Sequence, residues 1–262
     1  MRIVVVIPMF NKEELTRKCV EMVRKNYGTG EPIEIVVVDD GSVIPFVDPT
    51  INVVRLDVNS GFTAAANEGI LWAQYRNADY VLLLNNDTEP QLGFLQELKL
   101  ALDHNPDAGI AVSVRWHPDR EPLSYELHGA DLIRGYQYFC DKKSLSDVPV
   151  ETTWIPLCSG LIRMDMIREI GLLAKKFRNH CSDSEYCVRA RLHGWKVLLV
   201  CNSVVIHHHS LTTTENKINP SKDQALFIEQ LAGMEYAKLM NEMPLDMDNK
   251  SYGKIQFTTE TR

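Results

Sequence analysis

The chain has 262 residues, 45% of them hydrophobic and 24% charged, which suits one large α/β domain with a sizeable core. Its 28 basic and 35 acidic side chains give a formal net charge of −7, which argues against a protein that coats nucleic acid. No stretch approaches the ~20 apolar residues that span a bilayer, and the six cysteines are scattered singly. We therefore expect a cytoplasmic protein with reduced thiols and no transmembrane segment, for which any contact with a membrane is peripheral.

The first part of the chain alternates between apolar runs and amphipathic segments. Runs rich in β-branched residues predict parallel strands covered on both faces over residues 3–7, 33–38 and 80–84. Weaker candidates for the same sheet are residues 52–56 and 109–114. Amphipathic helices are expected between them over residues 11–27, 62–74 and 92–104. Asn11 is a candidate cap for the first helix, with Glu14 reaching back to it. The order predicts a doubly wound, mostly parallel sheet with helices on both faces over residues 1–115.

The second part of the chain predicts a smaller, partly antiparallel lobe of the same domain. Residues 116–150 are rich in Pro, Asp and aromatic residues and indicate irregular structure with short antiparallel strands. Six elements are expected after these residues. They are a strand over residues 154–163, broken at Ser159-Gly160, helices over 164–170 and 182–193, short strands over 196–200 and 203–207, and a long helix over 220–240. The tail over residues 243–262 is polar.

Polar residues follow three of the predicted strands. These clusters are Pro8-Met9-Phe10-Asn11, Asp39-Asp40-Gly41-Ser42 and Asn85-Asn86-Asp87-Thr88. Such residues often only shape turns, and for any single cluster that interpretation is preferred. Ligands of open α/β sheets bind outside the carboxyl ends of the strands, so three clusters on one edge favour a binding site.

Two common nucleotide-binding loops are missing from the sequence. A dinucleotide-binding loop needs G-x-G-x-x-G between the first strand and helix, where this chain has Pro8-Met9-Phe10-Asn11 and no glycine. No G-x-x-x-x-G-K-[S/T] loop occurs either. These absences also disfavour a nucleotidyltransferase, for which we expect a glycine-rich, lysine-bearing loop after the first strand.

From residue 1 to 212 the chain resembles the inverting glycosyltransferases of family 2 with the GT-A fold, in particular their rhamnosyltransferase-like branch. The three clusters match the family's P-x-[YF]-N, V-D-D-G-S and L-N-N-D-T motifs. Further matches follow in the family's order: Asn59-Ser60-Gly61-Phe62, Asn67-Glu68-Gly69, Ser159-Gly160, Ser182-Asp183-Ser184-Glu185 with Arg189, and His207-His208-His209-Ser210. Each match alone is weak, whereas their shared order and spacing are specific.

The resemblance implies a nucleotide-sugar donor, with a UDP- or dTDP-sugar as first expectation. Asp39 and Asp40 would accept hydrogen bonds from the base and the ribose. The residues implied in donor binding are Pro8, Phe10, Asn11, Asp39, Asp40, Asn59, Gly61, Asn67, Asn85 and Asn86.

A divalent cation, Mn²⁺ or Mg²⁺, is also implied, with Asp87 as a ligand that places it on the donor diphosphate. Asn85 and Asn86 replace possible carboxylates of the family's D-x-D element, so Asp87 is the one carboxylate expected to hold the metal, and Asn85 is a further candidate for the ribose or the metal through its amide oxygen. His207 is the first candidate for a further metal ligand and His209 the second, because both share one face of a continuing strand.

Asp183 is the implied general base, which removes the proton of the acceptor hydroxyl. A structural alternative exists, because Ser182 and Glu185 have the spacing of a capping box and Asp183 suits the start of a helix. The two interpretations are compatible, and the helix dipole is expected to keep Asp183 ionised.

The resemblance thus implies a nucleotide-sugar-binding half over residues 1–115 and an acceptor-binding, catalytic half over residues 116–242. The implied activity is transfer of a sugar, with inversion, to a hydroxyl of a glycan, a lipid-linked sugar or a protein-linked glycan, as in polysaccharide biosynthesis. The acceptor is expected over residues 116–160 and 172–181. The other functions considered are a catalytically silent sugar-nucleotide or glycan-binding module and a nucleotidyltransferase. Because Asp87 and Asp183 are both present, the enzyme is preferred.

Overall fold

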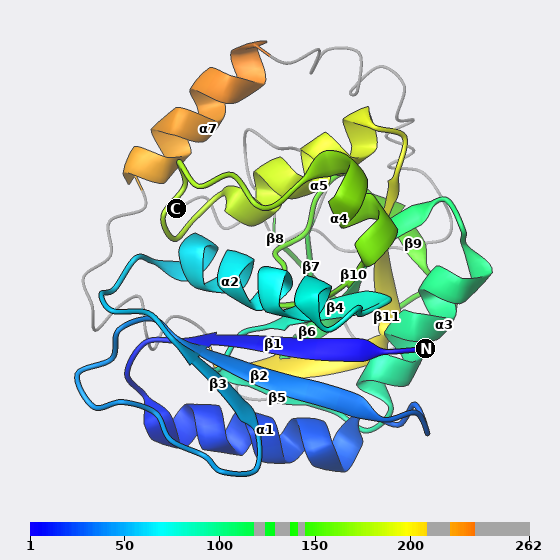
Figure 1. Ribbon diagram of the computed structural model, residues 1–262. Coiled ribbons are helices and arrows are strands. Elements are labelled where there is room, and N and C mark those ends of the chain that lie inside the picture. Colours follow the sequence, from blue (N-terminus) through cyan, green and yellow to red (C-terminus); the bar gives the residue numbers. More distant parts are fainter. Residues whose placement is uncertain (118–123, 129–136, 141–144, 209–220, 234–262) are drawn as a thin grey trace.

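A computed structural model describes residues 1–117, 124–128, 137–140, 145–208 and 221–233 (Figure 1). Its helices are α1 (Glu13–Asn26), α2 (Phe62–Tyr75), α3 (Phe94–His104), α4 (Met164–Ile170), α5 (Ser182–Leu192) and α7 (Ser221–Gly233). Its strands are β1 (Ile3–Met9), β2 (Ile33–Asp39), β3 (Asn52–Arg55), β4 (Tyr80–Leu84), β5 (Thr88–Pro90), β6 (Ala108–His117), β7 (Ser124–His128), β8 (Gln137–Cys140), β9 (Val150–Thr152), β10 (Ser159–Arg163) and β11 (Lys196–His207). None of the helices in these ranges has the length and apolar character needed to cross a bilayer.

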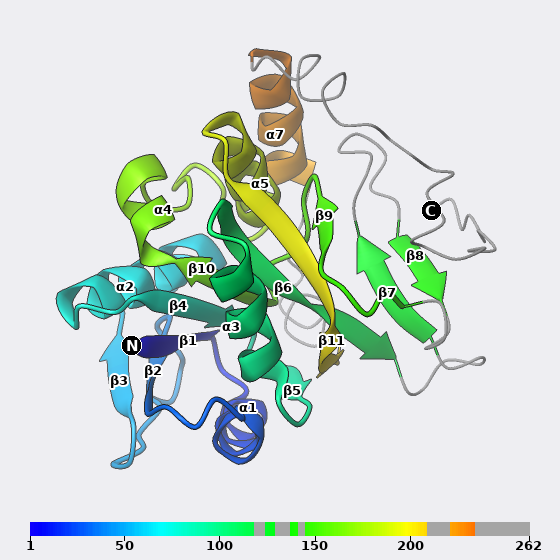
Figure 2. The same cartoon turned by 90° about the vertical axis from the view of Figure 1, so that its right-hand side faces the viewer.

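These strands join one sheet, whose main path runs β3-β2-β1-β4-β10-β6-β11-β5. The first four strands of the path are parallel, with Ile3 beside both Ile33 and Tyr80. β10 then pairs antiparallel with β4 and β6, while β11 runs parallel to β6. β7, β8 and β9 extend the sheet beside β6 and β11, so the second half of the chain is partly antiparallel, as expected (Figure 2).

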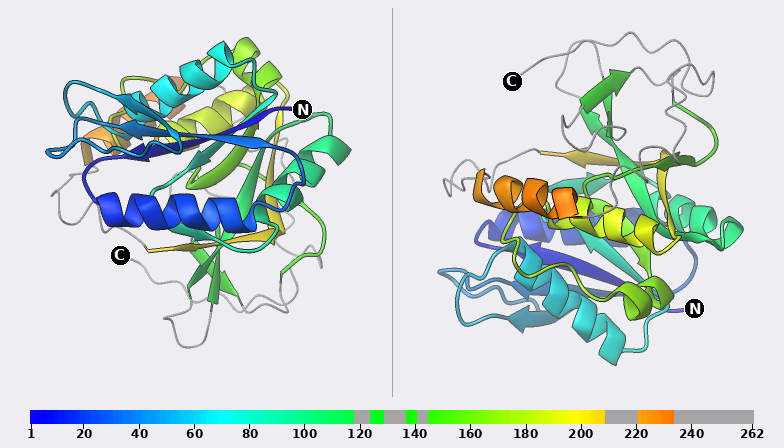
Figure 3. Two further views of the ribbon diagram at one scale, coloured as in Figure 1. Left: turned by 60° about the horizontal axis from the view of Figure 1, so that its bottom comes forward. Right: turned by 90° about the horizontal axis from the view of Figure 1, so that it is seen from above.

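Helices cover both faces of the sheet (Figures 1 and 3). Val4 and Val6 of β1 belong to the hydrophobic cluster that contains α2, α4 and α5. Val5 and Ile7 belong to the cluster that contains α1 and α3. Because each face is buried, the strands are apolar throughout instead of alternating with polar residues. The expected mostly parallel sheet with helices on both faces is therefore confirmed.

All strands and helices expected over residues 1–115 are present, but the second half needs two corrections. The strand expected over residues 154–163 begins only at Ser159, because residues before it have no strand partner. The two strands expected over residues 196–207 are one strand, β11, whose register against β6 shifts between Val200 and Val204. Its buried Ser203 hydroxyl is satisfied inside the sheet by Ser113, at 2.7 Å, so the chain need not leave the sheet there. The expected helix beyond residue 233 and the tail lie outside the described residues.

The predicted cap of the first helix was wrong. α1 begins at Glu13 after Asn11 and Lys12, which both have positive φ, and no side chain caps its first turn. The Asn11 side chain instead accepts a hydrogen bond from the backbone N–H of Val43, at 3.0 Å. A residue in the left-handed conformation does not present its side chain to the following turn as an extended cap residue does.

A glycine on α2 allows this helix to lie directly against β1. Gly69 is buried, and a Cβ added there would lie 2.1 Å from Cγ1 of Val6. The distance is far below van der Waals contact, and Val6 has no room to move within the covered sheet. Because α2 begins directly after the loop over residues 59–61, the close approach of α2 to β1 also determines where this loop lies.

We expect Gly69→Ala to lower the free energy of unfolding by about 1–2 kcal/mol. Overpacking of a buried site typically costs about 1–3 kcal/mol and outweighs the ~1 kcal/mol gain in helix propensity. Chemical denaturation measures the change, and Gln74→Ala at an exposed position of α2 serves as the control. In a Val6→Ala background the cost of Gly69→Ala should shrink, and an undiminished cost would contradict the steric explanation.

Candidate active site

The site lies at the edge of the sheet where β1, β2, β4 and β11 end. The loops after β2 and β4 carry Asp39-Asp40 and Asn85-Asn86-Asp87, and β11 ends at His207. β10 is antiparallel, so its first residue, Ser159, pairs with Leu84 at this same edge. The backbone N–H of Asn85 donates to the carbonyl of Cys158 at 2.9 Å. Strand ends from both halves of the chain thus form one rim, as the motif positions predicted.

Asp39 is fully buried at the end of β2. Its Oδ1 accepts the backbone N–H of Ser42 at 2.8 Å, and its Oδ2 accepts that of Phe46 at 3.1 Å and a hydrogen bond from Arg55. Burial alone raises the pKa of this carboxyl, but the hydrogen bonds from Ser42, Phe46 and Arg55 outweigh it, and the pKa of Asp39 is lowered. Asp39 is therefore an ionised group that holds the following loop in shape.

Asp40, the residue after Asp39, is also buried, and its carboxylate accepts hydrogen bonds from a different loop. Its Oδ1 accepts the backbone N–H of Ser60 at 2.7 Å, and its Oδ2 accepts that of Gly61 at 2.8 Å. Burial raises the pKa of Asp40 more than these two donors and the charge of Arg178 lower it. Gly61 has a φ of 95°, and a Cβ there would meet Arg178 at 2.5 Å, so glycine is required at this turn.

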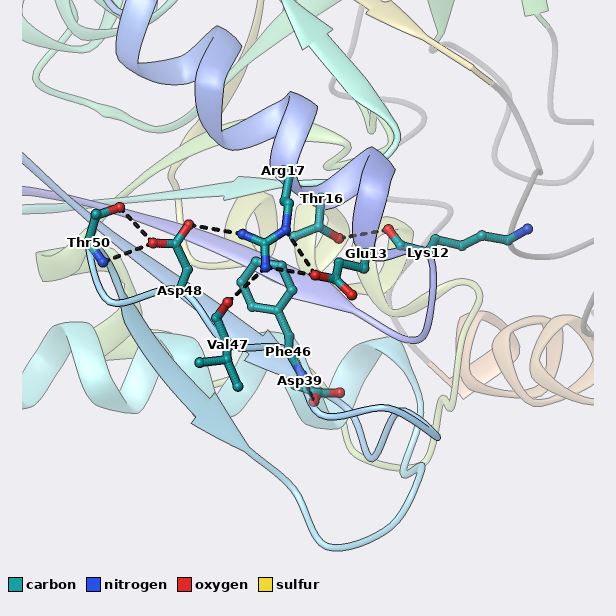
Figure 4. Close-up of polar contacts among 9 residues, drawn as sticks. All are labelled: Lys12, Glu13, Thr16, Arg17, Asp39, Phe46, Val47, Asp48 and Thr50. Carbon is teal, nitrogen blue, oxygen red and sulfur yellow. Dashed lines mark hydrogen bonds and ion pairs between the residues drawn. The ribbon is translucent and has the colours of Figure 1, made fainter.

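Contacts of Arg17 hold the loop after Asp40 against α1 (Figure 4). Arg17 of α1 lies over the ring of Phe46, 4.9 Å from its centroid, and donates to the carbonyl of Val47 at 2.8 Å. The same guanidinium pairs with Glu13 at 2.7 Å and with Asp48 at 3.4 Å. This contact fixes the backbone of Phe46, whose N–H donates to Asp39. No motif in the sequence indicates this contact.

Asp87 and His207 form a pair across the two halves of the chain. Oδ1 of Asp87 lies 3.1 Å from Nε2 of His207, and the Asn85 amide nitrogen lies 3.4 Å from the same ring atom. The pair is aligned by β5 and β11, where Thr88 stands opposite His207. The backbone N–H of His208 also donates to the carbonyl of Asp87, at 3.0 Å. The alternative ligand His209 lies outside the described residues.

The chemistry of this pair fits a divalent cation. A carboxylate suits Mg²⁺ and Mn²⁺, and a neutral imidazole suits Mn²⁺. Both side chains are more than nine-tenths buried, at 7% and 9% exposure. No group of three or more His, Cys, Asp or Glu side chains in the described ranges is arranged to hold a metal, so a cation here would take its remaining ligands from elsewhere.

Two asparagines expected to bind the donor are engaged within the protein. Asn67 is buried, donates to the carbonyl of Leu173 at 2.9 Å and accepts the Leu173 N–H at 3.0 Å. Asn86 donates to the hydroxyl of Thr16 on α1 at 3.1 Å. Asn67 thus links α2 to the segment after α4, and Asn86 links the loop of Asp87 to α1.

Asp183 lies in the first turn of α5, half-buried. Burial raises the pKa of Asp183 more than the backbone N–H groups of Ser184 and Leu157 and the charge of His180 lower it. This direction is opposite to the one expected from the helix dipole, because loss of water around the carboxylate outweighs the first-turn donors. A carboxylate with a raised pKa is a stronger base than an ordinary aspartate.

The predicted capping box at this helix was wrong. α5 starts after Cys181, which has a φ of 63°, and no side chain caps it. Glu185 is buried and pairs instead with Arg189 at 2.9 Å, and its other oxygen accepts a hydrogen bond from Gln230 of α7 at 3.1 Å. Asp183 is therefore not accompanied by a competing cap at its own helix start.

A continuous series of contacts joins the three acidic positions. The Asp40 carboxylate holds Gly61, and the next residue, Phe62, donates its N–H to Oδ1 of Asn179 at 3.0 Å. Asn179 lies four residues before Asp183, which receives a hydrogen bond from Leu157. Leu157 precedes Cys158, whose carbonyl holds the loop of Asp87. Asp40, Asp183 and Asp87 are thus brought to one edge of the molecule.

Several residues of this site were not singled out from the sequence. Arg55 and Arg178 supply the positive charge beside Asp39 and Asp40. Arg178 donates to the carbonyl and to Oδ1 of Asn59, at 2.8 Å and 2.5 Å. Neither arginine stands in a recognisable motif, and the second is 119 residues away in sequence from Asn59.

Residues 4–168 match the sequence profile described as Glycosyl transferase family 2. The chain belongs to this family. Among curated family 2 relatives, Glucomannan 4-beta-mannosyltransferase 9 of Arabidopsis thaliana is 25% identical over 215 residues, or 75% of this chain and 39% of the relative. Probable glucomannan 4-beta-mannosyltransferase 7 of Oryza sativa subsp. japonica is 24% identical over 216 residues, or 76% of this chain and 36% of the relative. The chain spans well under half the length of these curated relatives.

Two solved structures share the fold of this family 2 chain. GalNAc-T7, crystallised with UDP, GalNAc and Mn²⁺, has a TM-score of 0.66 and 16% identity, covering 79% of this chain and 44% of that one. S. aureus TarS 1-349 in complex with UDP-GlcNAc has a TM-score of 0.62 and 14% identity, covering 97% of this chain and 71% of that one. The likeness confirms the expected GT-A fold.

We expect Asp39→Asn to lower the free energy of unfolding at neutral pH by about 1–3 kcal/mol, because a buried, charge-assisted network loses its charge. The folded pKa of Asp39 is lowered, so its ionised form adds stability above the unfolded pKa of about 3.9, and this stability is lost as the pH falls through the folded pKa. The difference between wild type and variant should therefore narrow as the pH falls below about 4. Denaturation at a series of pH values measures it, with the exposed Asp165→Asn as control. A difference that is constant with pH would contradict the assignment.

Proposed function

We propose that this chain is an inverting glycosyltransferase that moves a sugar from a nucleoside-diphosphate sugar to an acceptor hydroxyl in glycan or polysaccharide biosynthesis. The observation that carries the proposal is the convergence of Asp39-Asp40, Asp87 with His207, and Asp183 on one sheet edge. Family membership and the fold support the activity class. The relatives are longer than this chain, so the activity of a whole protein is part of the proposal.

Residues 1–115 supply most of the proposed donor site. Asp39 and Asp40 each use their oxygens for backbone N–H groups, yet an ionised carboxylate has about four acceptor positions, so capacity remains for a base or ribose donor. Gly61 allows Arg178 to pack directly against the loop beside them, and Asn11 shapes the loop after Asp40 through Val43. Asn67 and Asn86 support the site through Leu173 and Thr16, and we assign them a positioning role in place of direct donor contact.

Asp87 and His207 would hold the divalent cation. Such a cation, Mn²⁺ or Mg²⁺, supplies positive charge to the leaving diphosphate when it is bound. The pairing of β5 with β11 holds the two side chains ready at the rim. To hold a cation through Nε2, His207 would be a neutral imidazole with no hydrogen on that atom, so its present contact with Asp87 would be exchanged for a bond to the cation.

Asp183 is the proposed general base for a single displacement. The acceptor oxygen forms a bond to the anomeric carbon, the bond from that carbon to the diphosphate oxygen breaks, and the hydroxyl proton moves to the Asp183 carboxylate. One displacement inverts the anomeric centre. The acceptor would lie over residues 116–160 and 172–181, of which residues 172–181 lead directly into α5. A glycan, a lipid-linked sugar and a protein-linked glycan all supply the required hydroxyl.

Asp183→Asn is expected to lower kcat by about 10²–10⁴-fold, because an amide cannot take the acceptor proton. The dissociation constant for donor nucleotide should stay within about twofold, since Asp39 and Asp40 are unaltered. Because the pKa of Asp183 is raised, wild-type kcat should fall with decreasing pH at a higher pH than an ordinary aspartate produces. Transfer from a panel of UDP- and dTDP-sugars measures this, and exposed Asp165→Asn is the control. A wild type that binds donor without transfer would favour the silent module, and formation of a nucleotide–sugar bond would favour a nucleotidyltransferase.

UDP or dTDP at 100 times its dissociation constant should add about 2.7 kcal/mol of stability, and only with Mn²⁺ or Mg²⁺ present. Asp87→Asn and His207→Gln should each raise the Mn²⁺ concentration needed for this shift about 10-fold or more, because each removes a proposed ligand. Thermal unfolding measures the shift, and a chelator should abolish it. The exposed His193→Gln, a histidine remote from this rim, is the matched control. Equal nucleotide shifts in chelator and in Mn²⁺ would contradict a metal at this site.

A further inference from the structure

Helix α7 lies beside α5 at the edge of the molecule, beyond the residues that match the family profile (Figures 1 and 3). Phe227 of α7 packs edge-on against Phe177, with ring centroids 6.2 Å apart and an interplanar angle of 75°. These two rings form a small hydrophobic cluster with Val188 of α5. The helix is therefore packed onto the segment that leads into Asp183.

One carboxylate of α7 collects three consecutive backbone N–H groups from that segment. Asp223 accepts the N–H of Arg178 at 3.1 Å and those of Asn179 and His180 at 2.9 Å each. The side chain is buried, with 6% of Asp223 exposed. Burial alone raises the pKa of Asp223, but the three amides outweigh it and lower the pKa. The carboxylate is thus a charged acceptor that fixes the turn over residues 178–180.

The turn over residues 178–180 lies between the loop over residues 59–61, beside the proposed donor site, and Asp183, the proposed base. Asn179 accepts the N–H of Phe62, and the carbonyl of Arg178 accepts the N–H of Thr63 at 3.1 Å, so the turn receives the start of α2. On its other side the chain passes through Cys181, in the left-handed conformation, to Asp183. The turn therefore determines where α5 begins relative to the donor-binding half.

An acidic residue in the first turn of a helix commonly interacts favourably with the dipole of its own helix. Asp223 has that position in α7, but the hydrogen bonds that it accepts come from a segment 43–45 residues earlier. Gln230, two turns further along α7, also reaches α5 and donates to Glu185 at 3.1 Å. The contacts of α7 are thus directed at the catalytic segment.

We propose that Asp223 is a positioning residue that holds the 178–180 turn so that Asp183 meets the acceptor hydroxyl. The inference rests on the proposed function. Asp39 and Asp40, which we propose bind the nucleotide sugar, are held in place by backbone N–H groups of Ser42, Phe46, Ser60 and Gly61. None of these four residues is hydrogen-bonded to Asp223. Arg178 and Asn179 also contact Asn59 and Phe62 beside the donor loop, so loss of the carboxylate should lower turnover by a larger factor than donor affinity.

Asp223→Asn is expected to lower kcat about 10- to 100-fold, because misplacement of a catalytic group by about 1 Å has effects of this size. The donor KM and the dissociation constant for UDP should change by a smaller factor than kcat. Hydrogen exchange should accelerate at the amides of residues 178–180 and stay unchanged in β1 and β4. Glu229→Gln removes a charge from an exposed position of the same helix and should alter none of these quantities.

Asp223→Glu keeps the charge but moves the carboxylate by one methylene group, so its kcat should lie between those of wild type and Asp223→Asn. It also provides the comparison if Asp223→Asn does not fold. Faster exchange at residues 178–180 with wild-type kcat would overturn the inference, as would an effect confined to donor KM. If wild type transfers sugar and Asp183→Asn does not, such a result leaves the proposed function intact. A wild type without transfer would overturn both.

Discussion

A buried carboxylate must be satisfied by hydrogen bonds, and the loops of this site are folded around that requirement. Asp39 takes backbone amides from the loop after β2, and Asp40 takes two from the loop before α2. Asp223 takes three from the turn before α5, and Asp183 takes those of Ser184 and Leu157. Each acid thus shapes a segment that is otherwise without regular structure. The rim has a defined geometry because backbone amides from separate segments converge on the buried carboxylates of Asp39, Asp40 and Asp223.

The same arrangement separates acids that hold structure from an acid suited to catalysis. Asp39 and Asp223 each gain enough donors to overcome burial, so the pKa of each is lowered and the charge is secure. Asp183 has fewer donors relative to its burial, so its pKa is raised and its affinity for a proton is greater. The pKa of Asp40 is raised as well, but Asp40 is only 3% exposed, whereas Asp183 is half-buried at the start of α5. Of the two, Asp183 is therefore the one that we propose takes a proton from an acceptor hydroxyl.

The sequence was informative wherever a residue pattern is local. Continuous apolar runs identified β1, β2 and β4, because strands covered on both faces need no polar side, and polar residues directly after them identified the rim. Local capping patterns failed twice. Asn11 and Glu185 have suitable spacing, but Asn11 bonds instead to Val43, and Glu185 bonds to Arg189 one turn along its own helix and to Gln230 of α7. The three amides on Asp223 come from a segment 43–45 residues earlier, and no pattern of neighbouring residues reports such a contact.

The division of the chain into a donor half and an acceptor half is not a division of the site. Asp87 belongs to the first half, but its partner His207 comes from the last strand, and the pairing of β5 with β11 brings them within 3.1 Å. The loop of Asp87 is also held by the carbonyl of Cys158, from the second half. Residues 1–115 alone would therefore contain the carboxylate of the proposed metal site without the imidazole or the contact that fixes its loop. The proposed donor site and the proposed base are therefore coupled, because each draws on strands and turns from both halves.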